Sequence, residues 1–165
     1  MDLKELEADV LALGEALRRR GWRLATAESC TGGLIAAACT SVAGSSDWFE
    51  RGFVSYSNLA KTQMLGVDAA LVTAHGAVSE EVARAMAQGA AEIADVELAV
   101  AVTGIAGPGG ATPDKPVGLV WLALARRGTS LLRLQSEKLQ LHGDRATVRE
   151  RTLRAALQRL HAAAA

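Results

Sequence analysis

One serine, Ser29, lies at a junction where its hydroxyl could act as a nucleophile or bind an anion. Residues 22–26 before it are typical of a short buried strand, and residues 34–39 after it are typical of a helix. Backbone N–H groups at the start of a helix point outward, and the helix dipole favours negative charge there. An ordinary helix cap is the commoner role of Ser29 or Thr31 at such a junction, so the rest of the chain must decide.

A serine nucleophile needs a base, and Lys61 is the best candidate for that base in this chain. A lysine can accept a proton when burial or a neighbouring cation lowers its pKa. Lys61 follows an apolar strand and lies five residues after Tyr56, whose hydroxyl could relay a proton or donate to an oxyanion. By spacing alone, a solvated helix lysine is the commoner role of Lys61, and Tyr56 could simply pack with its hydroxyl at the surface. Two of the three histidines are poorer candidates, because no obvious acid follows them: His75 and His161.

A glycine-rich segment, residues 104–110, follows Thr103 and holds four glycines and one proline in seven residues. Such a segment can bring backbone N–H groups close to an anionic ligand, and a tight crossover turn is the other explanation. It is neither a G-x-G-x-x-G motif nor a Walker loop, because no Lys-Ser/Thr pair follows its last glycine. Arg145, at the start of another expected helix, is a further candidate for binding an anion.

These polar clusters must be positioned by alternating strands and helices. Apolar patterning predicts helices over 2–20, 34–39, 58–65, 79–94 and from 143 onward, and strands over 22–26, 51–57, 97–103, 117–125 and 129–139. Such an alternation predicts an α/β fold. We expect a single three-layer α/β/α domain over residues 1–165, with a mixed, largely parallel central sheet. The clusters then follow strand ends, where α/β folds bind ligands.

Composition excludes several classes of protein. Lysine plus arginine equals aspartate plus glutamate at 18 each, which argues against a general nucleic-acid binder. Half of the residues are hydrophobic but only 4% are aromatic, so the core must consist of Ala, Val, Leu and Ile. The start of the chain lacks a signal-peptide pattern, and no apolar run approaches the roughly 20 residues of a membrane helix. Cys30 and Cys39 are expected to be reduced structural thiols, and the protein is expected to be cytoplasmic.

Five segments together identify a resemblance to a known family. They are Ala27-Glu28-Ser29-Cys30-Thr31-Gly32-Gly33, Ser55-Tyr56-Ser57-Asn58 with Lys61, Gly76-Ala77-Val78-Ser79, Thr103-Gly104-Ile105-Ala106-Gly107-Pro108 and Lys115-Pro116-Val117-Gly118. In sequence and in order they resemble the CinA C-terminal domain family, and the similarity extends over nearly the whole chain.

The resemblance implies an activity and roles for individual residues. Members that act alone hydrolyse the carboxamide of nicotinamide mononucleotide (NMN) to nicotinate mononucleotide and ammonia, a step of pyridine-nucleotide salvage, with no metal or organic cofactor. Ser29 is the implied nucleophile, Lys61 its base, and Tyr56 a residue that assists proton transfer or orientation. Further residues are implied to bind the oxyanion or the nucleotide phosphate: Cys30, Thr31, Gly32, Gly33, Thr103, Gly104, Gly107, Gly109 and Arg145.

Two other functions stay open on the sequence. The chain could be a non-catalytic nucleotide-binding or partner-docking module linked to competence or DNA damage, as the family name suggests, or an amidase that acts on another carboxamide. Its expected partner is a small-molecule substrate and neither a nucleic acid nor a membrane. A homo-oligomer is compatible with the alanine-rich helices, although their apolar faces can equally serve the core.

Overall fold

The computed structural model describes residues 2–165, so Met1, which the single-domain prediction of 1–165 includes, lies outside the described residues. Five strands form one sheet in the order β2-β1-β3-β4-β5. Their bounds are β1 Leu24–Glu28, β2 Phe49–Val54, β3 Leu98–Gly104, β4 Leu119–Arg127 and β5 Leu132–Gln140. β1 pairs in parallel with β2 and β3, whereas β4 pairs antiparallel with β3 and β5. The sheet is therefore mixed, with its parallel part around β1.

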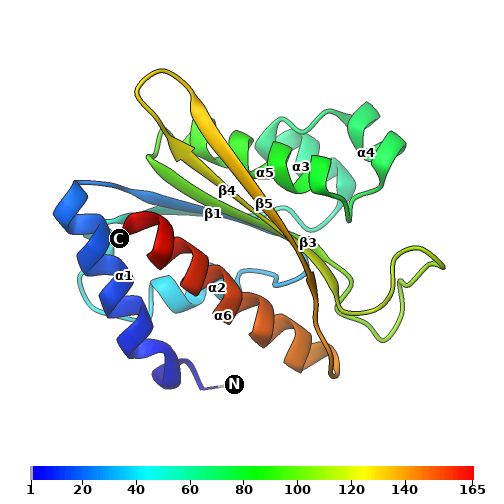
Figure 1. Cartoon of the computed structure of the whole chain (residues 1–165), viewed down its shortest axis with the longest axis horizontal. Helices are drawn as coiled ribbons and strands as arrows, with labels where there is room; N and C mark the ends of the chain where they lie inside the picture. The colour runs from blue at the N-terminus through cyan, green and yellow to red at the C-terminus, as the bar shows by residue number, and fades with distance from the viewer. Residues whose placement is uncertain (1) are drawn as a thin grey trace.

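Helices cover both faces of this sheet (Figure 1). One layer holds α1 Glu7–Arg20, α2 Leu34–Cys39 and α6 Arg145–Ala164, and the other holds α3 Asn58–Leu65, α4 Ala69–His75 and α5 Glu80–Ala94. Two short 3-10 segments, Leu3–Leu6 and Ser45–Asp47, complete the regular structure. The prediction of a three-layer α/β/α domain is confirmed.

Several predicted boundaries were wrong. The strands predicted over 117–125 and 129–139 instead end and begin at Arg127 and Leu132, because pairing continues through Arg126 opposite Arg133 and Arg127 opposite Leu132. Charged side chains on this edge hairpin can stay in solvent while the backbone ladder extends beneath them. Helix α4 was not predicted: of its seven residues only Val72 is buried, so the segment has no apolar face that a pattern could indicate. Ser57, which the prediction assigned to the preceding strand, caps α3, and its hydroxyl accepts the Ala60 N–H at 3.0 Å.

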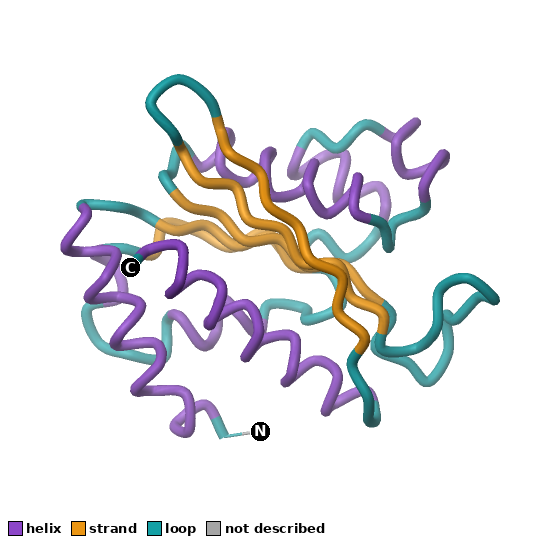
Figure 2. Tube along the Cα trace, viewed as in Figure 1, coloured by secondary structure: helices purple, strands orange, loops and turns teal. Residues whose placement is uncertain are grey.

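The two faces of the sheet differ in side-chain size. On the α5 side, alanines form two rows across β1, β3 and β4: Ala25, Ala99 and Ala125, and Ala27, Ala101 and Ala123. The opposite face carries larger side chains, which pack against α1, α2 and α6. Small side chains let α5 approach the sheet closely, and Figure 2 shows α5 lying along the central strands. The alanine-rich composition is thus used to build a thin layer between sheet and helix.

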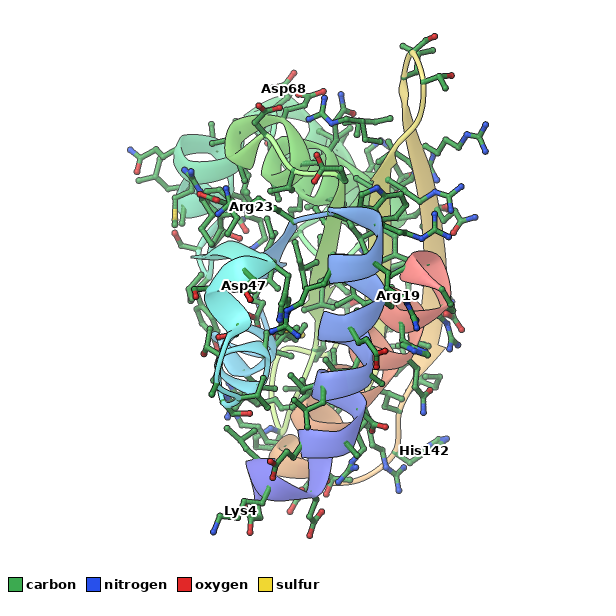
Figure 3. The ribbon with its side chains drawn as sticks, turned by 90° about the vertical axis from the view of Figure 1, so that its left-hand side faces the viewer. Lys4, Arg19, Arg23, Asp47, Asp68 and His142 are labelled. Atoms are coloured by element: carbon green, nitrogen blue, oxygen red, sulfur yellow. The ribbon has the colours of Figure 1, made fainter. Side chains whose placement is uncertain are left out.

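The polar side chains labelled in Figure 3 lie on the outside of these layers. Lys4 and His142 lie at one end of the molecule, and Asp68 lies at the other. Among the helices of the described residues, none combines the length and the apolar character needed to cross a membrane.

The contact between α5 and α3 yields a prediction about stability. Gly89 lies in α5, and a Cβ atom at this position would overlap the carbonyl oxygen of Leu65 at the end of α3. Gly89→Ala should lower the free energy of unfolding by about 1–3 kcal/mol, although alanine has the higher helix propensity, because backbone must move to make room. Urea unfolding followed by circular dichroism measures the change.

Gln88→Ala, at the exposed neighbouring position of α5, is the matched control and should change stability by less than about 0.5 kcal/mol. Equal stability of Gly89→Ala and the wild-type protein would contradict the close packing of α3 on α5.

Candidate active site

Three neighbouring strands end at one edge of the sheet, and their ends surround a pocket. β2, β1 and β3 run parallel, so the segments that follow them lie side by side. The pocket has a volume of about 210 Å³. Its lining consists of Ser29, Cys30, Tyr56, Asn58, Lys61, Ala77, Val78, Thr103, Gly104, Ala106 and Arg145. All three residues expected to be catalytic are therefore part of one concave surface.

Lys61 and Ser29 are in direct contact within this pocket. Lys61 Nζ lies 3.1 Å from Ser29 Oγ, although 32 residues separate them in the chain. The amine also donates to the carbonyl oxygens of Ser55 at 3.0 Å and Tyr56 at 3.2 Å. Lys61 is only 1% exposed, so its interpretation as a solvated helix lysine was wrong. The first turns of α3 carry the lysine over the end of β2 toward the serine.

Burial changes the chemistry of the groups around Ser29. Removal from water lowers the pKa of the Lys61 ammonium below its ordinary value, because the charged form loses hydration. A larger share of Lys61 is then neutral and able to accept the serine proton. Burial also raises the pKa of the Cys30 thiol to about 12. Cys30 therefore stays a thiol next to the serine, with little thiolate to compete as nucleophile.

Tyr56 meets Lys61 through its backbone and not through its phenol. Its side chain is 58% exposed, and its Oη accepts a hydrogen bond from Arg145 Nη2 at 3.0 Å. Arg145 Nη1 donates to the carbonyl oxygen of Gly107 at 2.8 Å. The guanidinium of Arg145 thus joins the segments that follow β2 and β3 at the rim of the pocket.

The expectation that Ser29 caps the following helix was wrong. Gly33 is the N-cap of α2, and Ser29 N donates to Val102 O at 3.0 Å, so the serine continues the pairing of β1 with β3. The free N–H groups of α2 are bound instead by Glu28. Its carboxylate accepts from Ile35 N at 2.8 Å and from Ala36 N at 2.9 Å.

Two residues that hold the turn after Ser29, Glu28 and Arg149, were not predicted as site residues. Both bind Thr31 within that turn. The Thr31 hydroxyl donates to Glu28 Oε1 at 2.7 Å, and the Thr31 carbonyl accepts from Arg149 Nη2 at 2.9 Å. The signal for Glu28 was a single acid at the end of an otherwise uncharged strand. For Arg149 it was the spacing of four residues from Arg145, which places both side chains on one face of a helix.

Five residues expected to bind substrate do not line the pocket: Thr31, Gly32, Gly33, Gly107 and Gly109. Gly32 N donates to Ser29 O at 3.1 Å and closes the turn. Gly32 and Gly33 have φ angles of +61° and +101°, a region that glycine adopts most easily. These two glycines shape the turn that carries the serine.

Thr103 is a pocket residue whose hydroxyl is already engaged. The side chain is 1% exposed, and Oγ1 donates to the carbonyl oxygen of Ala77 at 2.8 Å. This hydrogen bond holds the segment before α5 against the end of β3. Gly104 follows, where a Cβ would lie 2.6 Å from Val120 Cγ2 and 2.8 Å from Leu119 O.

A larger hollow, of about 540 Å³, lies along β5 and away from the strand ends. Its charged side chains include Glu137 and Arg159, which bind each other through two hydrogen bonds of 2.6 and 2.9 Å. This arrangement satisfies both charges. The serine of this hollow, Ser136, donates to Glu80 Oε1 at 2.5 Å and accepts from Arg84 Nη1 at 3.1 Å, and no lysine or histidine is among the lining residues. The smaller pocket at the strand ends is therefore the better candidate for chemistry.

Comparison with known proteins gives consistent results. The sequence model of the CinA C-terminal domain matches residues 6–164. A CinA-like protein of Citrifermentans bemidjiense is 56% identical over 156 residues, which are 94% of this chain but 36% of that protein. The chain thus spans about a third of the length of such relatives. The nicotinamide-nucleotide amidohydrolase PncC of Pseudomonas putida is 53% identical over 148 residues, 90% of each chain.

A solved structure has the same fold. The crystal structure of the competence/damage inducible protein CihA from Agrobacterium tumefaciens superposes with a TM-score of 0.91 at 44% identity, covering 95% of this chain and 94% of that one. Sequence match and fold agree over almost all of the described residues. This chain belongs to the CinA C-terminal domain family.

Proposed function

We propose that this protein is a nicotinamide-nucleotide amidohydrolase that converts NMN and water to nicotinate mononucleotide and ammonia. The observation that carries the proposal is the 3.1 Å contact between a buried lysine amine and the Ser29 hydroxyl in a pocket at the strand ends. The similarity to PncC over nine tenths of both chains supports the same reaction. Amide carbons are weak electrophiles, and an activated hydroxyl divides their hydrolysis into two easier steps.

In the first step, Ser29 Oγ attacks the carboxamide carbon while neutral Lys61 takes the hydroxyl proton. The Cys30 N–H, directly after the nucleophile, is assigned to the oxyanion, since the Gly32 N–H is engaged with Ser29 O. The protonated Lys61 then gives its proton to the amide nitrogen. The C–N bond breaks, ammonia leaves, and the nicotinoyl group stays on Ser29 as an ester.

In the second step, water attacks this ester and passes a proton to Lys61. The C–O bond to Ser29 breaks, and Lys61 returns the proton to the leaving Ser29 oxygen. The products are the nicotinate carboxylate and the free serine. One lysine serves as base and acid in both halves, which requires a pKa that allows both protonation states.

The size of the pocket indicates how the nucleotide would lie. A pocket of about 210 Å³ is smaller than the roughly 300 Å³ or more that encloses a drug-sized ligand. It suits the pyridine ring and its carboxamide, which leaves the ribose and phosphate at the rim. Arg145 is exposed there, and its present acceptors, Gly107 O and Tyr56 Oη, are uncharged. A phosphate is a stronger acceptor for the guanidinium than either.

Removal of the serine hydroxyl tests the mechanism. Ser29→Ala should reduce ammonia release from NMN by at least about a thousandfold, because no acyl-enzyme can form. A coupled ammonia assay measures the rate, and circular dichroism checks the fold. Ser130→Ala, an exposed serine in the loop between β4 and β5, should retain wild-type activity. Full turnover by Ser29→Ala would exclude Ser29 as nucleophile, and a wild-type protein that binds NMN without releasing ammonia would indicate a binding module.

The buried lysine predicts a pH dependence. Lys61 acts as base only when neutral, and burial lowers its pKa, so the neutral fraction grows as pH rises through a value below the ordinary pKa of 10.5. The rate kcat should therefore rise with pH and level off below pH 10.5. In Lys61→Arg the side chain stays protonated and activity should be lost at every pH. A kcat that falls with pH over the same range would contradict the base role.

Arg145 should distinguish NMN from its dephosphorylated form. Arg145→Met should raise KM for NMN about 10- to 100-fold, which corresponds to the loss of one or two charge-assisted hydrogen bonds to the phosphate. The slower hydrolysis of nicotinamide riboside, which has no phosphate, should not change. Steady-state kinetics on both substrates measure the effect. Arg151→Met, an exposed arginine of α6 whose Nη1 binds His142 O, is the control. Equal losses with both substrates would show that Arg145 does not bind the phosphate.

A further inference from the structure

We propose that Glu28 is a positioning residue that directs Ser29 toward Lys61. Glu28 is the last residue of β1 and is 0% exposed. In the sheet it lies beside Val102 of β3, which in turn lies beside Leu122 of β4. A carboxylate in such apolar surroundings is costly unless its oxygens are hydrogen-bonded. The inference rests on the proposed function, because it assigns a purpose to this acid in the reaction of Ser29.

The hydrogen bonds of Glu28 satisfy both of its oxygens. Oε1 accepts from the Thr31 hydroxyl at 2.7 Å and from Ile35 N at 2.8 Å, and Oε2 accepts from Ala36 N at 2.9 Å. The Thr26 hydroxyl lies 3.4 Å from Oε2 as a weaker donor. Backbone N–H groups can only donate, so each oxygen must act as an acceptor. The positive end of the α2 dipole adds to this stabilisation.

The direction of the Glu28 side chain determines the direction of Ser29. Consecutive residues of a strand point to opposite faces, and the Ser29 N–H still pairs with Val102 O at 3.0 Å, as in a continued strand. Leu24, two pleats before Glu28, packs in the core under α1, α2 and α6. Glu28 reaches α2 on that same face. Ser29 is thereby turned to the opposite face, where α3 presents Lys61.

The hydrogen bonds of Thr31 extend this restraint to the turn. The Thr31 hydroxyl is bound to Glu28, and its carbonyl is bound to Arg149 Nη2 at 2.9 Å, so the turn is held from two sides. The turn also closes on the nucleophile itself, since Gly32 N donates to Ser29 O at 3.1 Å. A displacement of the Glu28 carboxylate would reach Ser29 both through the adjacent peptide and through this turn.

The binding of the α2 N–H groups by Glu28 differs from an ordinary helix cap. The N-cap residue of α2 is Gly33, which has no side chain to offer, and the six-residue helix is bound by a carboxylate five residues earlier in the chain. The φ of +101° at position 33 favours glycine, so the N–H groups of α2 must find their acceptor elsewhere in the chain. Because Glu28 directly precedes Ser29 and binds the first N–H groups of α2, it couples the start of α2 to the nucleophile.

Glu28→Gln is the variant that tests this role. The amide has the size of the carboxylate, but its NH₂ group cannot accept, so the N–H of Ile35 or Ala36 loses its acceptor. We expect kcat for NMN to fall about 10- to 100-fold, because a displaced Ser29 hydroxyl is poorly aligned with the carboxamide carbon, with KM within about twofold of wild type. Glu137→Gln makes the same change in a carboxylate bound to Arg159 on β5 and should leave both constants unchanged.

A second measurement, the titration midpoint of the Lys61 amine, reports on the site without any catalytic turnover. NMR of ¹³C-labelled lysine side chains gives the titration of Lys61, whose signal is assigned by its absence in Lys61→Arg. In Glu28→Gln the midpoint for Lys61 should move upward toward the ordinary value for a lysine, because a displaced serine turn admits water to the amine. A purely structural loss that leaves the folded site intact would not move this midpoint. Glu137→Gln should not move it either.

The outcomes separate this proposal from the proposed function. Wild-type kcat and an unchanged Lys61 midpoint in folded Glu28→Gln, even with a lower unfolding temperature, would overturn the positioning role. If Glu28→Gln does not fold, Thr31→Val removes one donor to the same carboxylate and should change kcat and the midpoint in the same direction; wild-type values for it would equally overturn the proposal. A wild-type protein that releases no ammonia from NMN defeats the proposed function alone, and the Lys61 midpoint then decides the role of Glu28.

Discussion

The burial of one lysine amine is the constraint on which this site depends. Lys61 Nζ has three acceptors, the Ser29 hydroxyl and the carbonyl oxygens of Ser55 and Tyr56, and all three are uncharged. Among the described residues no carboxylate forms an ion pair with it. A carboxylate partner would stabilise the ammonium and raise its pKa, whereas neutral acceptors in a dry site leave the pKa low. The surroundings of Lys61 thus satisfy its hydrogen bonds while keeping its neutral form accessible.

The packing of α3 explains how a lysine reaches this position. Lys61 and Leu65 are one helical turn apart on the buried face of α3, and the Leu65 carbonyl touches α5 at Gly89. α5 in turn lies close to the sheet, because β1, β3 and β4 present two rows of alanine side chains to it. The close packing of α3 on α5, and of α5 on the sheet, brings the amine of Lys61 to the end of β1, where Ser29 lies.

The sequence predicted the layers better than it predicted the contacts. The apolar strand 97–103 and the helix 79–94 follow from local pattern, and their counterparts β3 and α5 agree closely with the expected ranges. The Ser29–Lys61 contact joins residues 32 positions apart, and no local pattern indicates that β1 and β2 are neighbours in the sheet. Residue chemistry made Lys61 the best candidate base for Ser29, and the resemblance of five motifs then implied the same pair. Spacing alone favoured an exposed lysine, because burial of a lysine is a property of tertiary packing.

The role of Glu28 could not be derived from the sequence for a related reason. A serine before two glycines satisfies the rules for a local helix cap, and those rules give no weight to an acid that precedes the turn. The deciding fact is the pleat of β1: it points Glu28 into the α2 layer and Ser29 into the α3 layer. Glu28 and Ser29 point to opposite faces only if the strand continues through Ser29. The hydrogen bond from Ser29 N to Val102 O establishes that continuation, and the sequence alone does not show it.

Helix α6 binds the same region from outside without taking part in the Ser29–Lys61 contact. Arg145 donates to Gly107 O and to the phenol of Tyr56, and Arg149 donates to Thr31 O, so one face of α6 joins the segments that follow β3, β2 and β1. Under the proposed function, a phosphate at Arg145 would compete with the first two of these bonds and leave the third intact. Substrate binding could then rearrange the rim of the pocket while the serine turn, held by Glu28 and Arg149, keeps its place. The proposed chemistry and the proposed recognition of the nucleotide therefore depend on different contacts within one compact edge of the sheet.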